Sequence, residues 1–279
     1  MGEPKTAQID VLVPTCDRPV ELATTLAGLA AQTGVRFRVL VSDQSDGPPS
    51  YATPAADTLI RALRRRGTAV ELHRHLPRRG IAEQRSFLLS LATAPAVLFL
   101  DDDVWLETGV LDRLHHALRT LECGFVAAAM QGLSHLDDRR PDECAPFEVW
   151  EGPVQPETIA KDGPAWGRWT LGNAANAVHL AESLGLDRGP VPPPESWVPY
   201  KIAWAAGCVL FDRRALLEAG GFDFWSAIPD AAHGEDVLVQ LRVMARRGGA
   251  GILPSGAYHQ QSVTTIPSRH TSAVDVLPL

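Results

Sequence analysis

The chain has 279 residues, of which 45% are hydrophobic and 21% are charged, a composition typical of an ordinary globular protein. Its formal net charge of −7 argues against a general nucleic-acid-binding protein, and no nucleic-acid partner is expected. No apolar run approaches the roughly 20 residues of a membrane span. The first residues lack a signal-peptide pattern and the four cysteines form no Cys-x-x-Cys pair, so we expect a cytoplasmic protein.

The first half of the sequence alternates between strand and helix patterns. Strands are expected at 9–13, 37–41, 69–73, 95–100 and 125–130. Helices are expected from Pro19 onward and at 55–66, 80–93 and 109–122. This order predicts an α/β fold with a mostly parallel, Rossmann-like sheet and helices on both faces.

The second half is less regular at first. Residues 132–205 are rich in proline and glycine and carry five tryptophans, and the run 189–194 must be a loop. Regular elements are expected again as a strand at 208–211, helices at 213–219 and 235–247, and a short strand at 251–253. The tail after Thr265 is mostly polar and is expected to be loose.

Three consecutive carboxylates, Asp101, Asp102 and Asp103, follow the apolar strand at 95–100. Ligands of open α/β sheets bind outside the carboxyl ends of the strands. The mutual repulsion of three carboxylates is tolerated where a cation or water lies between them, and Asp oxygens suit Mg²⁺, Mn²⁺ and Ca²⁺. Alternatively the triplet caps the next helix, although Thr108 also suits that position. The triplet alone leaves both interpretations open.

Further short motifs accompany the triplet in a fixed order. They are Val13 to Arg18, Val41 to Asp43, Gly80 with Arg85, Phe99 to Asp103, Ala206 to Cys208, Gly220 to Asp223 and Gly234 to Asp236. Together they resemble the family 2 glycosyltransferases, which have the GT-A fold. The resemblance covers residues 9–259.

The resemblance implies transfer of a sugar from a nucleoside-diphosphate sugar to an acceptor nucleophile, usually a hydroxyl, with inversion of the anomeric centre. It implies a divalent cation, Mn²⁺ or Mg²⁺, that neutralises the leaving diphosphate. Asp103 would bind this metal, Asp101 would contact the ribose or the metal, and Asp102 could take either role. His259 would be a further metal ligand, although a lone histidine is more often structural.

The resemblance also assigns a nucleotide pocket, formed by Pro14, Thr15, Asp17 and Asp43. Asp43 would face the base, and Arg85 or Arg79 would reach the diphosphate. The family usually has Asn after this arginine, where this chain has Ser86. Without the resemblance, these residues are equally typical of turns, caps and solvated helix faces.

Glu235 and Asp236 would form the catalytic pair of the second half. By resemblance Asp236 is the general base that takes the proton of the acceptor hydroxyl, and Glu235 binds acceptor or donor sugar. The alternative is that both carboxylates only favour the N-terminus of the helix that follows. His233 is the next candidate for an acceptor contact.

The implied organisation is a nucleotide-sugar-binding half at 1–130, an acceptor-binding and catalytic half at 131–262, and a tail at 263–279. The donor would carry UDP, GDP or dTDP, and the acceptor would be a small molecule, saccharide or peptide. The chain lacks a Gln-x-x-Arg-Trp motif, which favours a single transfer over processive synthesis. A sugar-nucleotide nucleotidyltransferase or a non-catalytic carbohydrate-binding protein are the alternatives, and a haloacid-dehalogenase-type phosphatase fits less well.

Overall fold

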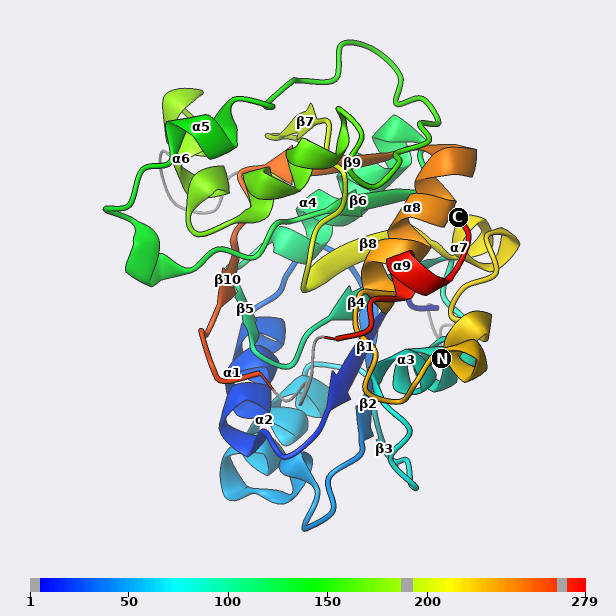
Figure 1. Cartoon of the computed structure of the whole chain (residues 1–279). Helices are drawn as coiled ribbons and strands as arrows, with labels where there is room; N and C mark the ends of the chain where they lie inside the picture. The colour runs from blue at the N-terminus through cyan, green and yellow to red at the C-terminus, as the bar shows by residue number, and fades with distance from the viewer. Residues whose placement is uncertain (1–5, 187–192, 265–269) are drawn as a thin grey trace.

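The computed structural model describes residues 6–186, 193–264 and 270–279. An eight-stranded sheet with the order β3-β2-β1-β4-β8-β6-β9-β7 runs through the molecule (Figure 1). Its strands are β1 (Ile9–Thr15), β2 (Phe37–Asp43), β3 (Val70–Arg74), β4 (Ala96–Leu100), β6 (Phe125–Ala127), β7 (Val198–Tyr200), β8 (Cys208–Asp212) and β9 (Gly249–Leu253). A second sheet pairs β5 (Val104–Leu106) with β10 (Ala257–His259) in antiparallel fashion.

Four strands at one side of the large sheet are parallel. β1 pairs in parallel with β2 and β4, and β2 pairs in parallel with β3. Their carboxyl ends therefore meet at one edge, where Thr15 lies opposite Asp43 and the acidic triplet follows β4. β8 runs antiparallel between β4 and β6, so strands of both halves of the chain form one continuous sheet.

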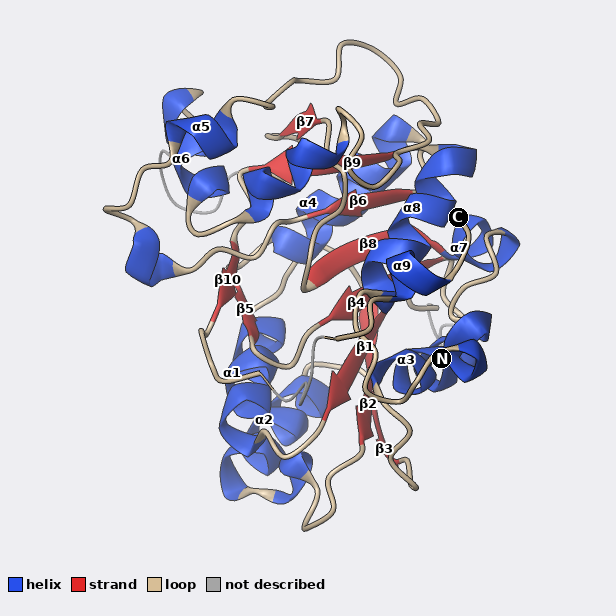
Figure 2. Cartoon of the chain, viewed as in Figure 1, coloured by secondary structure: helices blue, strands red, loops and turns tan. Residues whose placement is uncertain are grey.

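Helices cover both faces of this sheet, as Figure 2 shows. One face packs against α1 (Pro19–Ala30), α2 (Pro54–Arg65) and α4 (Val110–Leu121). The other packs against α3 (Ile81–Leu91), α6 (Asn176–Ser183), α7 (Arg213–Glu218) and α8 (Glu235–Arg247). The shorter helices are α5 (Pro141–Cys144), α9 (Ala273–Val276), and the 3₁₀ turns η1 (Ser50–Ala52), η2 (Leu133–His135), η3 (Trp166–Gly172) and η4 (Asp223–Ala227).

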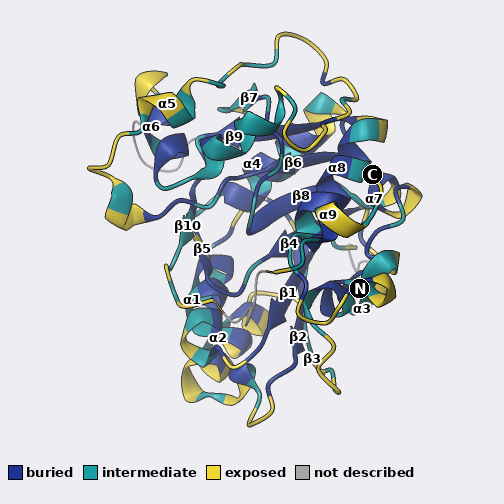
Figure 3. Cartoon of the chain, in the orientation of Figure 1, coloured by how far each residue is buried: buried dark blue, intermediate teal, exposed yellow. Residues whose placement is uncertain are grey.

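The strand sequences explain this two-sided packing. Successive side chains of a strand point to opposite faces, so Val11 and Val13 of β1 enter one apolar cluster and Leu12 enters the other. All seven residues of β1 are buried, as expected for a strand covered on both faces. Figure 3 shows the central strands as the buried part of the molecule, with exposed residues on the outer turns and loops.

The α/β fold expected from the sequence is confirmed, and the strands and helices expected in the first half are present with ends shifted by a few residues. The cap interpretation of the triplet is wrong, because β5 follows it and Gly109, not Thr108, is the N-cap of α4. The short strands β5, β7 and β10 and the helix α6 were not anticipated. The expected loop at 189–194 lies largely outside the described residues.

The described end of the chain is not loose. The backbone of Thr271 accepts a hydrogen bond from the His233 N–H, and the Ala273 N–H donates to the His233 carbonyl. Ala273 is fully buried, in one apolar cluster with Leu238 of α8. The expectation of a loose tail is wrong for residues 270–279, because Ala273 buries apolar area against α8. None of the helices in the described ranges has both the length and the apolar character that a membrane span requires.

Candidate active site

A cavity of about 740 Å³ opens at the carboxyl edge of β1 and β4. One wall comes from the ends of these strands and carries Thr15, Arg18 and the acidic triplet. The opposite wall comes from residues 230–237, which lead into α8. Both halves of the chain therefore contribute side chains to one cavity.

Asp102 and Asp103 are surrounded by donors. Asp102 accepts hydrogen bonds from Thr15 Oγ1 at 2.6 Å and from Arg18 Nη1 at 3.1 Å. Asp103 Oδ2 lies 2.5 Å from the same Arg18 nitrogen and 3.1 Å from His259 Nε2. The backbone is held as well, since Thr25 Oγ1 donates to the Asp102 carbonyl at 2.7 Å. The strand end thus presents its carboxylates in fixed positions.

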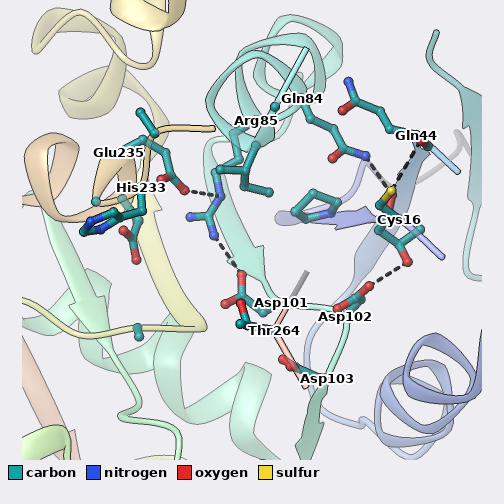
Figure 4. A pocket seen from close by; sticks show the side chains of 18 of the residues that line it. Cys16, Gln44, Gln84, Arg85, Asp101, Asp102, Asp103, His233, Glu235 and Thr264 are labelled. Carbon is teal, nitrogen blue, oxygen red and sulfur yellow. Dashed lines mark hydrogen bonds and ion pairs between the residues drawn. The ribbon is translucent and has the colours of Figure 1, made fainter. Parts of the chain in front are cut away.

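Arg85 connects the two walls of the cavity. Its Nη2 lies 2.8 Å from Asp101 Oδ1, and its Nε lies 3.3 Å from Glu235 Oε1. Figure 4 shows the guanidinium between these two carboxylates, one from the end of β4 and one from the start of α8. Arg85 is buried, with 6% of its surface exposed, so these contacts fix the distance between the strand end and α8.

The three carboxylates of the triplet differ in proton affinity, with burial as the largest influence on each. Burial raises the pKa of Asp102 to about 7, against the opposing effects of Thr15 and Arg18. Burial also raises the pKa of Asp101, and the attraction of Arg85 does not overcome it. Burial has the same tendency at Asp103, but hydrogen bonds from His259 and Arg18 outweigh it and lower the pKa. Two of the three carboxylates therefore lack sufficient compensating positive charge.

Glu235 and Asp236 begin α8 and differ in their surroundings. Burial raises the pKa of Glu235 to about 7, Arg85 opposes this, and the neighbouring Asp236 adds to it. Asp236 is half-buried and its Oδ1 accepts the Val237 N–H at 2.9 Å. Both residues line the cavity. A carboxylate facing a cavity with an acidic neighbour is suited to take up a proton.

A glycine allows the second wall to approach the first. Gly80 precedes α3 with φ of +85°, and a Cβ at this position would lie 2.0 Å from the carbonyl oxygen of Asp230. A side chain at residue 80 would therefore push residues 230–236 away from α3. Gly80, which was named as part of a sequence motif, therefore has a steric role.

The cavity collects most of the residues expected from the sequence. They are Pro14, Thr15, Arg85, Asp101, Asp102, Asp103, Glu235, Asp236 and His259, with His233 beside them. None of Asp17, Asp43 and Arg79 is among the described residues that line it. Asp43 is fully buried and accepts the N–H groups of Ser45 at 2.8 Å and Ser50 at 2.7 Å, so here it shapes the loop after β2.

Asp17 and Arg79 lie outside the cavity, and both are exposed. Asp17 is exposed and has a positive φ of 55°, which fits the alternative of a turn residue. Arg79 is exposed, whereas its neighbour Arg78 lines the cavity. Arg85, expected at the diphosphate, is engaged by Asp101 and Glu235 in the structure described here.

Sequence reasoning overlooked two cavity residues. Arg18 was part of a motif but was given no role of its own, although a basic side chain three residues beyond β1 is in reach of the triplet. Gln84 is buried and donates to the carbonyl oxygens of Thr15 at 3.1 Å and Ser42 at 2.6 Å, which joins α3 to the ends of β1 and β2. Its position next to Arg85 on α3 was the available signal.

The tryptophans of the middle segment separate into two groups. Trp150 and Trp197 pack against one apolar cluster, and Trp166, Trp169 and Trp204 pack against the other. Trp204 also lines the cavity, and its ring stacks on Trp169 with centroids 5.9 Å apart and an interplanar angle of 1°. The segment therefore contributes an aromatic side chain to the cavity wall as well as residues of the core.

The side chains at the triplet offer ligand atoms that a divalent cation accepts. Asp103 Oδ2 and His259 Nε2 converge and supply one carboxylate oxygen and one imidazole nitrogen, both acceptable to Mn²⁺. In the described part of the chain, no group of three or more His, Cys, Asp or Glu side chains is arranged to hold a metal. Cations of this kind are commonly bound by one or two protein side chains together with substrate phosphates, so the residues fit a metal that arrives with a diphosphate.

The sequence model of a known family matches residues 10–158, and the family is described as glycosyl transferase family 2. The chain belongs to this family. The glycosyltransferase identity expected from the motifs is therefore confirmed at the level of family. No curated protein matches the sequence.

Solved glycosyltransferases share the fold. S. aureus TarS 1-349 superposes with a TM-score of 0.54 at 15% identity, covering 90% of this chain and 60% of that one. The complex of TarS 1-349 with UDP-GlcNAc gives a TM-score of 0.51 at 15% identity, with 93% and 60% covered. This chain thus spans 60% of the length of those TarS chains. At this identity the likeness establishes the GT-A fold.

Proposed function

We propose that the protein transfers a sugar from a nucleoside-diphosphate sugar to a hydroxyl acceptor, once per binding event and with inversion. One observation carries this proposal. The acidic end of β4 and the carboxylates at the start of α8 face each other across one cavity, and Arg85 holds them at a fixed separation. A donor lying between them would have its diphosphate at one wall and its reacting carbon toward the other.

The first half would bind the donor. Thr15, Arg18 and the triplet lie at the edge where ligands of open α/β sheets bind. Asp103 and His259 would hold a Mn²⁺ or Mg²⁺ ion, which would neutralise negative charge on the leaving diphosphate. Gln84 keeps the strand ends in place through its backbone hydrogen bonds.

The second half would activate the acceptor. Asp236 would accept the proton of the acceptor hydroxyl while that oxygen forms a bond to the anomeric carbon. The bond from the anomeric carbon to the diphosphate oxygen breaks, and the electron pair leaves with the diphosphate. Glu235, which contacts Arg85, would keep the start of α8 in place.

The acceptor would lie beside Trp204. The parallel stack of Trp204 on Trp169 offers a flat apolar surface at the cavity wall, and such surfaces suit the apolar face of a sugar or an aromatic group. This supports a saccharide or aromatic small molecule over an extended peptide. It also supports the division into a donor-binding half at 1–130 and an acceptor-binding half at 131–262.

The nucleotide and the compartment rest on indirect support. TarS, which shares the fold, binds UDP-GlcNAc, so UDP-sugars are the first donors to test, before GDP- and dTDP-sugars. All four cysteines are free, which supports a reducing compartment such as the cytoplasm.

A donor screen tests the proposal. Thermal unfolding is measured with UDP-, GDP- and dTDP-sugars, with and without Mn²⁺, because a ligand that binds the folded state raises its stability. Donors that raise the melting temperature are then tested for release of nucleoside diphosphate with saccharide acceptors. Metal-dependent release of UDP, GDP or dTDP is the expected result.

Two outcomes would contradict it. Release of pyrophosphate from a nucleoside triphosphate and a sugar 1-phosphate would indicate a nucleotidyltransferase. Saccharide binding without turnover of any donor would indicate a carbohydrate-binding protein.

A further inference from the structure

Arg18 occupies the position where a positive charge is most needed. Its Nη1 contacts Asp102 Oδ1 at 3.1 Å and Asp103 Oδ2 at 2.5 Å, and its Nη2 donates to the carbonyl oxygen of Val263. Arg18 is buried, with 9% of its surface exposed, yet it lines the cavity. The protein thus has its own cation at the acidic triplet.

This guanidinium and a metal ion would use the same atom. Asp103 Oδ2 is the oxygen that faces His259 Nε2, and these two atoms are the donor pair that fits a divalent cation. The same oxygen accepts the short contact from Arg18 Nη1. Two positive charges within a few ångströms repel strongly where the surroundings exclude water, so Arg18 in this position opposes metal binding.

The side chain can leave without disturbing the fold. The backbone of Arg18 is anchored, because its N–H donates to Ser50 Oγ at 3.1 Å and Pro19 follows as the first residue of α1. The charged end is attached to this anchor by a flexible chain and borders the open cavity. A planar guanidinium that is released there can form paired hydrogen bonds to phosphate oxygens.

We propose that Arg18 is a displaceable internal counter-ion of Asp102 and Asp103, which yields Asp103 to a divalent cation and moves onto the donor diphosphate when metal and donor bind together. The inference rests on the proposed donor class. It predicts that metal alone binds weakly. Metal and nucleotide then bind cooperatively, because the diphosphate gives Arg18 a new partner.

Direct Mn²⁺ binding tests the inference without reference to activity. Free Mn²⁺ is measured by electron paramagnetic resonance during titration of the nucleotide-free protein, for the wild type, Arg18→Gln and Arg18→Lys. Arg18→Gln is expected to bind Mn²⁺ at least tenfold more tightly than the wild type, because the competing charge is gone. Arg18→Lys keeps the charge and should stay close to the wild type. Arg61→Gln, at an exposed helix pair, controls for net charge and should change nothing.

Two additions define the site and the role of the nucleotide. His259→Ala in the Arg18→Gln background should abolish the gain if the ion lies between Asp103 and His259. Calorimetry with UDP, GDP and dTDP at saturating Mn²⁺ should give at least roughly tenfold weaker binding to Arg18→Gln, the size expected when a charge-assisted hydrogen bond to phosphate is lost.

Unchanged or weaker Mn²⁺ binding by a folded Arg18→Gln protein would overturn the inference and make Arg18 a fixed structural cation. Tighter Mn²⁺ binding with unchanged nucleotide binding would overturn the move onto the diphosphate. Donor turnover by the wild type is measured separately. Turnover together with either of these results leaves the proposed function standing. Absence of turnover with every donor overturns the proposed function, and the Mn²⁺ and nucleotide titrations then decide the inference about Arg18 by themselves.

Discussion

Carboxylates paired with arginine are buried both at the amino ends and at the carboxyl ends of the parallel strands. The two sites differ in how completely the arginines compensate the carboxylates. At the amino end, Asp10 of β1 is fully buried and accepts from Arg38 Nε at 2.8 Å and Nη2 at 2.7 Å. The N–H groups of Thr93 and Ala94 complete its contacts. At the carboxyl end, three carboxylates share Arg18 and Arg85 around an open cavity.

The proton affinities report this difference. Burial tends to raise the pKa of Asp10, but the hydrogen bonds from Arg38 and from the backbone outweigh it, and the pKa lies below its ordinary value. At the carboxyl end, burial raises the pKa of Asp101 and Asp102 in spite of the arginines. One end is a satisfied ion pair that stabilises the fold, and the other holds carboxyl groups whose ionised form is only partly compensated, which a bound cation would complete. Substitutions at the carboxyl end should therefore change function, and substitutions at the amino end should change stability.

The largest effect is expected at Asp236. Asp236→Asn keeps the size of the side chain and removes the proton acceptor, so the transfer rate should fall by roughly 10²–10⁴-fold, the usual contribution of a general base. Steady-state kinetics should give a lower kcat with a similar donor KM. Glu235→Gln is the matched control. If Glu235→Gln lowers the rate more than Asp236→Asn does, the roles of the two carboxylates are exchanged. A near-normal rate for Asp236→Asn would show that Asp236 is not the base, and His233 would be the next candidate.

Asp103→Ala should separate binding from stability. Removing this carboxylate relieves repulsion on Asp101 and Asp102 but also takes a partner from Arg18 and His259, so the melting temperature should fall only modestly and the protein should stay folded. Affinity for the nucleoside diphosphate in Mn²⁺ should fall by roughly 100-fold, since metal neutralisation of phosphate charge is worth several kcal/mol. Calorimetry measures this loss. Asp17→Ala, exposed and in the neighbouring loop, is the control, and equal affinity of the Asp103 variant would refute the metal role.

Asp10→Asn should have the opposite profile. It leaves the half-buried Arg38 without its fully buried main partner, so the free energy of unfolding at pH 7 should fall by about 3 kcal/mol. Because the pKa of Asp10 is lowered in the folded state, its contribution is complete above about pH 5 and is lost as pH falls below the ordinary value of 3.8.

Urea denaturation at pH 7 and at pH 3 measures the free energy of unfolding of the wild type and of Asp10→Asn. The difference between them should shrink at pH 3, and a difference independent of pH would refute the assignment. Asp57→Asn removes one partner of an exposed ion pair on a helix, so it should leave the free energy of unfolding nearly unchanged at both pH values.

The smallest effect is expected at Trp204. Trp204→Ala removes the aromatic surface from the cavity wall, so the acceptor KM should rise by roughly 5–10-fold, the range of a single aromatic contact. Donor hydrolysis without acceptor should stay the same. Trp204→Phe should keep most of the affinity. A change in donor KM instead of acceptor KM would contradict the division between donor and acceptor halves.

The sequence by itself indicated the layered α/β fold, because alternating apolar strands and amphipathic helices leave few ways to bury their apolar faces. The acidic triplet stands out locally, because three carboxylates directly follow an apolar strand. The role of the pair at 235–236, by contrast, came from the resemblance to the family and not from the neighbouring residues.

Only the tertiary structure decided which charges meet. Asp43 and Arg79 were both expected at the nucleotide site, but Asp43 bonds to its own loop and Arg79 faces outward. Arg18 and Arg85, in contrast, contact carboxylates that lie 84 and 16 residues away in the chain. Such pairings depend on which rotamers the packed strands and helices leave open, and on the burial that makes each unpaired charge costly. Neither quantity has a local pattern in the chain, so the cation that belongs to the triplet became apparent only once β1, β4 and α8 were brought together.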